Sequence, residues 1–416
     1  MIVTNNGVIN CPDFFPTIGW PAGRGEYDRL FQNLDYFCDK LDHKHFLFNF
    51  SSFAFGFTIP KNDFQNQFEN MKNYSIKEIL KNNTSIDSKT ADDLIILLDV
   101  GGNRIFNKVV SDSKDVKSIN SYDIYTNAYR DFVSKSNADI FVNFDIGPSY
   151  STRDEISKKG VKIWESLDNK VKKELNKNLL DLSIDMKEDN LIMVPISGVN
   201  EKDFEENLNY LYDTYEDNID IIGIAGIANK GPDHLIKILS IFSKFKEHKS
   251  WDVKSHGLGL GGWQKIPYLV NYGVDTCDVA TPWRRACTDS VSQVYIPLID
   301  EEGNFMNNSD PFSYNPINSP MYDDLTCNCP FCNDLPLVDI KRIYQNSDKR
   351  NTGNSNHLDD YYQMRVRIFF HNVFQHKSLL KKMHEYKEDY GSDFISKFSK
   401  DLPEGKMKSA LNKNSL

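Results

Sequence analysis

The sequence predicts an α/β fold with a (β/α)8 TIM barrel at its centre, and two observations support this prediction. Eight short apolar segments, rich in β-branched and aromatic residues, recur between residues 14 and 281. Longer segments with apolar residues every three or four positions separate most of them, an alternation typical of parallel strands joined by helices. Eight parallel strands are the number that closes such a barrel. The expected strands are Phe14–Gly19, His45–Phe50, Leu94–Val100, Asp139–Asp145, Leu191–Ile196, Ile219–Ile224, Trp251–Gly257 and Thr276–Thr281.

The segments between the strands show helical periodicity. Phe204, Leu208 and Leu211, for example, share one face of the segment Glu201–Tyr215. The expected helices are Glu26–Lys40, Ser121–Ser136, Thr152–Asn176, Glu201–Tyr215, Asp233–Phe245, Trp263–Tyr272 and a long one from His357 to about Tyr390.

The domain plan follows from these elements. We expect residues 1–306 to form the barrel, with residues 54–92 as an insertion, because this polar segment exceeds a normal connection. Residues 307–395 are expected to form a smaller subdomain that ends in the long helix. The Lys-rich end, within 396–416, is predicted to be a flexible tail.

Composition excludes several classes of protein. Charged residues are 26% and hydrophobic residues 40% of the chain, which is an ordinary globular balance and excludes wholesale disorder. No apolar run reaches membrane-spanning length, and the first residues lack the features of a signal peptide, so we expect a cytoplasmic protein with no membrane partner. The net charge of −10 argues against holding nucleic acid by bulk electrostatics, so any such contact requires a local basic surface.

Polar residues and glycines fall at the C-terminal ends of the expected strands. Active sites of (β/α)8 barrels are built at that face, so residues far apart in the sequence are predicted to converge on one barrel mouth. The residues at these ends are Asp99, Asp145, Ser197 with Gly198, Gly226, His256 and Asp278.

Three of these residues are aspartates, which suits chemistry at a glycosidic bond. Attack at an anomeric carbon needs one ionised carboxylate as nucleophile and a second group that manages protons. The alternative for Asp99 and Asp145 is helix capping, which Asp before Gly often performs. His256 is expected either to bind substrate or to have a packing role only.

The cysteines predict a metal site. Seven is an odd number, and Cys327, Cys329 and Cys332 lie within six residues, which indicates reduced thiols and a metal cluster rather than a disulfide framework. A tetrahedral Zn²⁺ site needs a fourth ligand, for which the tail offers three histidines. The candidates are His371, His357 and His376.

Two motifs in this order resemble the tRNA-guanine transglycosylase superfamily. The first is HGLGLG from His256 followed by GVDxxDxxxPxRxA from Gly273, and the second is the C-x-C-x-x-C cluster from Cys327. The resemblance implies that Asp278 is the nucleophile that bonds to C1′ of the target nucleotide as guanine leaves. A free base then displaces the carboxylate.

The resemblance also assigns roles to the other strand ends. It implies that Asp99 handles the proton and touches the substrate, that Asp145 recognises the guanine edge, and that Ser197, Gly198 and Gly226 line the base pocket. It favours His371 as the fourth Zn²⁺ ligand, followed by His357. With four protein ligands no position is open for water, so the metal is expected to be structural.

Some positions depart from the tRNA enzymes. Val100 replaces the usual serine after Asp99, Asn103-Arg104 replaces a Tyr-Gln pair, and Ser197 stands where glutamine is usual. Together with the N-terminal segment and the insertion, these differences are more similar to the bacterial and phage branch that modifies DNA.

That branch exchanges guanine in DNA for a 7-deazaguanine such as preQ0. The expected partners are therefore DNA and a free 7-deazaguanine base, with Arg284 and Arg285 placed to contact phosphates. A homodimer or an accessory protein is left open. The alternatives are a transglycosylase that acts on tRNA and a non-catalytic barrel subunit of such an enzyme.

Overall fold

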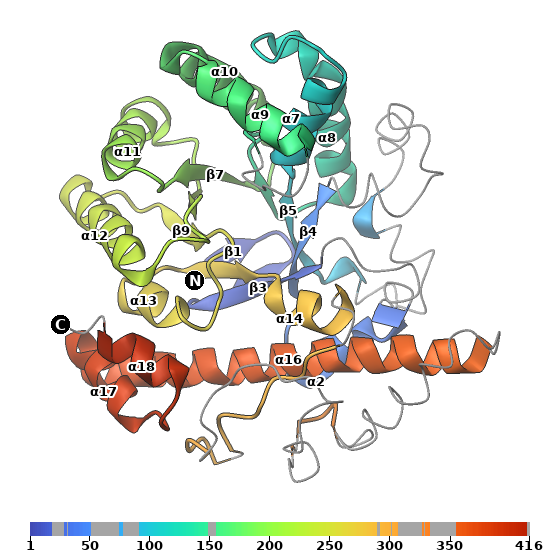
Figure 1. Ribbon diagram of the computed structural model, residues 1–416, viewed down its shortest axis with the longest axis vertical. Helices are drawn as coiled ribbons and strands as arrows, with labels where there is room; N and C mark the ends of the chain where they lie inside the picture. The colour runs from blue at the N-terminus through green and yellow to red at the C-terminus, as the bar shows by residue number, and fades with distance from the viewer. Residues whose placement is uncertain are drawn as a thin grey trace.

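The computed structural model has a closed barrel of eight parallel strands at its centre (Figure 1), which confirms the predicted fold class. The strands follow one another around the barrel in the order β10-β3-β4-β5-β6-β7-β8-β9. The structure describes residues 1–18, 29–30, 32–50, 75–77, 91–148, 155–288, 292–300, 302–306, 327, 329–332 and 355–413, but not the side chains of 355–359 and 406.

Each barrel strand overlaps one predicted segment. The largest difference is at β6, which is shorter than Asp139–Asp145 at both ends. Asp139 lies just before it, and its carboxylate accepts the backbone N–H of Ile96 at 2.9 Å. The strands are β3 (Asp13–Ile18), β4 (His45–Asn49), β5 (Ile95–Asp99), β6 (Ile140–Val142), β7 (Leu191–Ser197), β8 (Ile221–Ala225), β9 (Lys254–Gly257) and β10 (Thr276–Val279).

Alternation along the strands separates two buried clusters. On β5, Ile95 and Leu97 belong to the smaller cluster inside the barrel, whereas Ile96 and Leu98 belong to the large cluster between strands and helices. Because side chains two residues apart share a face, Asp99 points to the inside at the carboxyl end of the strand. The same rule brings polar ends of other strands to that mouth.

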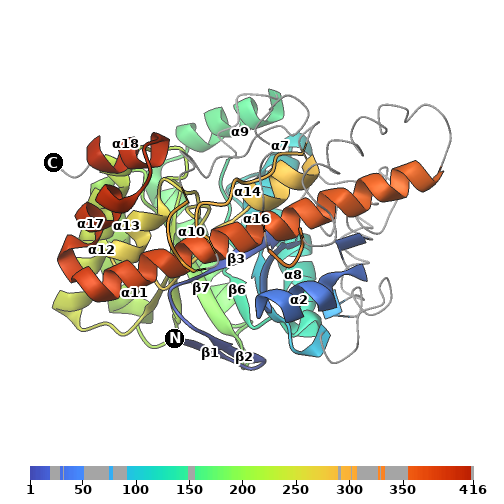
Figure 2. The same cartoon turned by 90° about the horizontal axis from the view of Figure 1, so that it is seen from below.

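A short hairpin closes the opposite end of the barrel. Strands β1 (Ile2–Thr4) and β2 (Gly7–Ile9) pair antiparallel, and they were not predicted. Ile2 and Ile9 are buried with the residues inside the barrel, and Asn6 in the turn donates to the Asp139 carboxylate. The hairpin lies beside the N-terminus in Figure 2.

Helices surround the barrel, as Figure 1 shows. Two predictions need correction. The single helix expected over Thr152–Asn176 is two helices, because the Asp168 carboxylate accepts the N–H of Lys170 and begins a new one; α7 was not predicted. The helices are α2 (Leu34–Leu41), α7 (Gly102–Ser111), α8 (Asp123–Ser136), α9 (Glu155–Ser166), α10 (Asn169–Ile184), α11 (Glu201–Tyr215), α12 (Pro232–Lys249), α13 (Ile266–Asn271) and α14 (Thr281–Trp283), with the short turns η1 (Ile119–Ser121) and η2 (Arg284–Thr288).

The C-terminal part of the chain packs on one side of the barrel. The long helix α16 (Ser355–Tyr390) contacts β3, α13, α14 and η2, and Figure 2 shows it running across the molecule. The flexible tail predicted for 396–416 is wrong for residues up to 413. These form α17 (Phe394–Asp401), preceded by the turn η5 (Gly391–Asp393), and α18 (Lys406–Lys413).

The tail is ordered because it carries its own apolar face. Phe394, Phe398, Leu402, Met407 and Leu411 are all buried against the large cluster. Most of the insertion expected at 54–92 lies outside the described residues. Within the described part, no helix is both long and apolar enough to span a membrane.

Candidate active site and metal centre

Asp278 lies near the carboxyl end of β10 with its side chain 10% exposed. Its Oδ1 accepts the backbone N–H of Gly259 at 2.5 Å, and its Oδ2 accepts the hydroxyl of Thr17 at 3.2 Å. The Nε2 atom of His256 lies 3.3 Å from Oδ1. The carboxylate is therefore held in one orientation while part of it remains open to solvent.

The glycines after His256 allow this turn to approach Asp278 closely. Gly259 has a φ of +66°, a conformation that side chains rarely adopt, and its N–H points at the Asp278 carboxylate. A Cβ on Gly261 would lie 2.6 Å from the backbone oxygen of Asp278, which is closer than atoms can pack. The turn can thus lie directly against the nucleophile candidate.

His256 is fully buried on β9. Its Nδ1 lies 2.9 Å from the Thr276 hydroxyl, and its Nε2 faces Asp278. No atom of the ring reaches the open face of the site. Of the two roles considered for His256, its position fits a packing role behind the carboxylate rather than contact with substrate.

Asp99 ends β5 and lies beside Asn49, its register partner on β4, whose side-chain amide donates to the Asp99 carboxylate. Burial raises the pKa of Asp99; hydrogen bonds from Gly101 and Asn49 oppose this effect, and the charge of Asp278 adds to it. Because the charge of Asp278 acts on Asp99, the two carboxylates lie in one region of the barrel mouth.

Asp145 follows β6 and faces the same region. Burial, and then the charge of Asp99, raise the pKa of Asp145 to about 7. A Cβ on Gly102 would lie 1.8 Å from the backbone oxygen of Asp145, so the second glycine of Asp99-Val-Gly-Gly allows α7 to start against this segment. The capping alternative does not hold for Asp99, because Gly101 occupies the N-cap of α7.

Ser197 and Gly226 lie side by side at the mouth. Ser197 is exposed at the end of β7, in register with Ala225 of β8, and a Cβ on Gly226 would lie 2.8 Å from its hydroxyl oxygen. The backbone N–H of Gly198 is used within the protein, because it donates to the Ala225 backbone oxygen at 2.8 Å. Its carbonyl oxygen lies 2.6 Å from His234 Nε2, so both polar groups of Gly198 have partners within the protein.

The two arginines follow β10 in the turn η2. Arg284 is exposed, whereas Arg285 is half-buried and donates to the Gln293 side chain at 2.6 Å. The charges of both act on the buried Tyr295 hydroxyl. The Arg284 side chain is therefore exposed to solvent, whereas that of Arg285 is held against the protein.

Three contributors to the site were not predicted. Thr17 contacts Asp278, Asn49 contacts Asp99, and the charge of Arg104 on α7 acts on Asp99. Thr17 and Asn49 are polar residues within the predicted strands Phe14–Gly19 and His45–Phe50. A systematic check of each strand for polar residues near its carboxyl end would have found both.

The candidate metal centre is where His371 of α16 meets the three cysteines. The His371 Nδ1 atom lies 3.5, 3.3 and 3.3 Å from the Sγ atoms of Cys327, Cys329 and Cys332. Zn–S and Zn–N bonds of about 2.3 and 2.0 Å in a tetrahedron place such atoms about 3.5 Å apart. The four side chains therefore fit a Zn²⁺ ion.

The surroundings of this cluster favour metal binding. The Nε2 atom of His371 lies 2.8 Å from the backbone carbonyl oxygen of Tyr295. This contact fixes the ring so that Nδ1 faces the thiols. Hydrogen bonds from Cys329 and Cys332, and the nearby His371, hold the pKa of the Cys327 thiol well below its ordinary value, which favours the thiolate that binds metals.

Of the rival histidines, His376 is excluded as a ligand by its position. It is buried between Phe14 and Trp263, with ring centroids 4.6 and 5.2 Å away. The side chain of His357 lies outside the described residues. His371 is thus the histidine that the structure brings to the cysteines.

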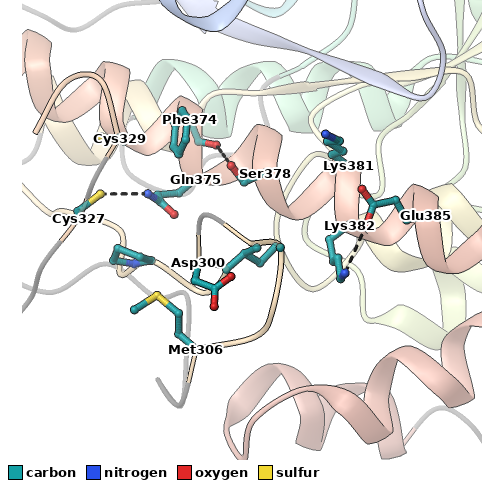
Figure 3. A pocket seen from close by; sticks show the side chains of 13 residues that line it. Asp300, Met306, Cys327, Cys329, Phe374, Gln375, Ser378, Lys381, Lys382 and Glu385 are labelled. Carbon is teal, nitrogen blue, oxygen red and sulfur yellow. Dashed lines mark hydrogen bonds and ion pairs between the residues drawn. The ribbon is translucent and has the colours of Figure 1, made fainter.

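A separate pocket of about 440 Å³ lies beside the metal centre (Figure 3). Gln375 forms one wall and donates to the Cys327 Sγ at 3.5 Å, while Lys381, Lys382 and Asp300 contribute charges. It is lined by α16 and the segment that follows η2, so it is distinct from the barrel mouth.

Comparison with known proteins supports the assignment that the geometry suggests. A search of curated proteins finds no match to this chain. A family model described as queuine tRNA-ribosyltransferase, TGT, matches residues 62–352, which includes β5 to β10 and the three cysteines. The match covers well over half of the chain. With its closed barrel, its aspartates at the mouth and its Cys3His cluster, this chain belongs to the queuine tRNA-ribosyltransferase family.

Proposed function

We propose that the protein exchanges guanine in DNA for a 7-deazaguanine base such as preQ0, through a covalent bond between Asp278 and the target nucleotide. Membership of the family supports guanine transglycosylase activity in general. The observation that carries the chemistry is the Asp278 carboxylate, which is held by Thr17, His256 and Gly259 and remains partly open at the barrel mouth.

In the first step an Asp278 oxygen attacks C1′ of the deoxyribose. The bond between C1′ and the guanine nitrogen breaks, its electron pair leaves with the base, and an acid supplies a proton to the departing guanine. Asp99 suits this role because burial raises its pKa and keeps a protonated form accessible.

In the second step the incoming base displaces the carboxylate. Asp99, now ionised, takes the proton from the ring nitrogen of the free base, which attacks C1′ and releases Asp278. Two inversions at C1′ give net retention. His256 has no direct part in either step; it holds the carboxylate from behind, through its own contact with Thr276.

Asp145 is proposed to select the base. An ionised carboxylate accepts hydrogen bonds from a ring N–H and an exocyclic amine, which guanine-like bases offer together and adenine does not. Ser197 and Gly226, which lie side by side, are proposed to line the same pocket. A serine in place of glutamine at 197 leaves room beside the base and suits a substituted deazapurine.

The choice of DNA depends on the sequence differences from the tRNA enzymes, at Val100, Asn103, Arg104 and Ser197. Arg104 is the most informative, because its charge acts on Asp99, beside the proposed reaction centre. The family description favours the alternative polymer, tRNA, and the barrel has the same task in either case. The target nucleotide must leave its stack and enter the mouth.

The Cys3His cluster is proposed to hold Zn²⁺ as a structural ion. The four ligands leave no position for water. When bound, the ion ties residues 327–332 to α16, which packs against β3 and η2.

A base-exchange assay tests the proposal. The protein is incubated with radiolabelled guanine and either duplex DNA or tRNA, and the label in the polymer is counted. Label in DNA supports the proposal, whereas label in tRNA alone would replace it with the alternative polymer. If neither polymer is labelled, with or without preQ0 as competitor, the chain is a non-catalytic subunit.

A further inference from the structure

A second group of metal-ligating side chains lies at the opposite end of the barrel from Asp278. Asp13 begins β3, His45 begins β4, and His43 precedes that strand by two residues. One ligand atom from each of the three lies within 4.8 Å of the other two. These residues come from neighbouring parallel strands, so their position depends on the barrel itself.

The spacing within this group resembles that of metal ligands. The Nε2 atom of His45 lies 3.2 Å from Oδ2 of Asp13, and one donor atom of His43 lies within 4.8 Å of both residues' donor atoms. Zn–N and Zn–O bonds of about 2.0–2.2 Å in a tetrahedron place two ligand atoms about 3.4 Å apart. The His43 and His45 rings are tilted by 41°, so they are not stacked in parallel.

The His43 ring is buried and its nitrogens have no hydrogen-bond partner within the described residues. His43 is 0% exposed and neither of its nitrogens has a hydrogen bond within the described residues, whereas Nε2 of His45, which is 6% exposed, faces the Asp13 carboxylate. The rings nearest to His43 besides His45 belong to phenylalanines 14, 37 and 46, which offer no acceptor. Buried polar groups in native proteins normally have hydrogen-bond partners, so the unpaired ring nitrogens of His43 need an explanation.

We propose that Asp13, His43 and His45 form a second metal site, which binds a divalent transition-metal ion such as Zn²⁺. Two imidazoles and one carboxylate are a donor set that such ions accept, and hard Mg²⁺ or Ca²⁺ would require more oxygen ligands. The three ligands leave at least one position for water. The site goes beyond the proposed function, because no step of base exchange uses it.

The position of these three residues indicates that a bound metal ion would support the structure of the active site. The Phe15 ring lies between His45, at 5.1 Å, and His256, at 5.8 Å, and Phe15 is the register partner of Asp278. A metal ion at the base would fix the starts of β3 and β4 below the nucleophile. Residues at this face of a (β/α)8 barrel typically contribute stability rather than chemistry.

Metal stoichiometry tests the site. The full-length protein is stripped with chelator, dialysed against excess Zn²⁺, passed through a desalting column and analysed for bound zinc. We expect about two ions per chain in the wild type, one at each site, and one fewer in His43→Phe and in Asp13→Asn. His376→Phe is the matched control: it removes an equally buried histidine without partners, outside the ligand set, and should keep both ions.

A wild type that retains one ion per chain would overturn the proposal, and so would variants that retain both. Because the variants may lose their fold, Co²⁺ titration of the metal-free wild type provides an independent measurement. The cysteine site gives an intense thiolate charge-transfer band with the first equivalent. The second equivalent should add only weaker ligand-field bands; failure to bind, or further growth of the thiolate band, contradicts the proposed ligands.

Discussion

The Nε2 atom of His256 lies 3.3 Å from Oδ1 of Asp278, the same oxygen that accepts the Gly259 N–H at 2.5 Å. The imidazole is fully buried, and Thr276 holds its other nitrogen. One of the groups that hold the proposed nucleophile is therefore a ring with no exposure to solvent. This arrangement separates positioning from reaction, and the first prediction depends on it.

Replacing His256 should affect the reaction step more than base binding. In His256→Phe the ring is retained but the contact with Asp278 is lost, so the carboxylate can turn away from C1′. We expect kcat for base exchange to fall about 10²-fold while KM for the free base changes little. Steady-state kinetics with labelled guanine measure both. A KM effect without a kcat effect would show that His256 contacts the base.

Asp278→Asn should abolish exchange. The amide has the same shape but cannot form the covalent intermediate, so we expect a loss of at least about 10³-fold. The measurement is incorporation of labelled guanine, together with denaturing gels that detect the covalent adduct in the wild type. Asp252→Asn is the control, because that side chain is 95% exposed and distant from the mouth. Full activity of Asp278→Asn would identify another nucleophile.

Base recognition should depend on pH through Asp145. Its pKa of about 7 means that the accepting, ionised form is lost as pH falls from 8 to 6. We expect KM for guanine to rise about tenfold over that range. In Asp145→Asn the dependence should disappear, together with most of the affinity.

The same shift predicts the effect of Asp145 on stability. The folded protein binds this proton more tightly than the unfolded chain, whose pKa is near the ordinary 3.8. The contribution is therefore complete below about pH 4 and is lost as pH rises through about 7. Urea denaturation should find that Asp145→Asn is more stabilising relative to wild type at pH 8 than at pH 4. Equal effects at both values would mean that the pKa of Asp145 is not raised.

Removal of the zinc ion should loosen the C-terminal part of the molecule. Cys332→Ser removes one ligand at the point where the cysteine segment meets α16. We expect Tm to fall by about 5–15 °C and one equivalent of zinc to be lost. Cys38→Ala, a buried cysteine on α2 outside the cluster, should retain its zinc. A Cys332→Ser protein with unchanged zinc content would exclude this residue as a ligand.

Arg284 should contribute to binding of the polymer. Its side chain is exposed in the turn η2 that follows the nucleophile strand. Arg284→Ala is expected to weaken DNA binding at all sequences and to reduce the slope of log K against log salt by about one. Filter binding at several salt concentrations measures the slope. Lys173→Ala removes an exposed charge from α10 instead, and should leave it unchanged.

The local sequence carried much of the fold. Strands of a parallel barrel are buried on both faces, so their apolar segments were recognisable and all eight were located. The exact ends of the strands were harder to predict. At β6 the sequence does not show whether Asp139 lies within the strand or just before it. The β1–β2 hairpin was missed because three-residue strands have too little pattern of their own.

Sequence by itself indicated which residues are candidates for chemistry: an aspartate near the end of each of several strands and three cysteines in one short segment. Only the tertiary structure decided how they act. In the structure His256 contacts Asp278, and the Gly198 N–H donates to a neighbouring strand. His371, rather than His376, lies beside the three thiols. Asp13, His43 and His45 lie close together. Such relationships join residues distant in the chain. They arise from the register of neighbouring strands and the packing of α16, which periodicity along the sequence does not encode.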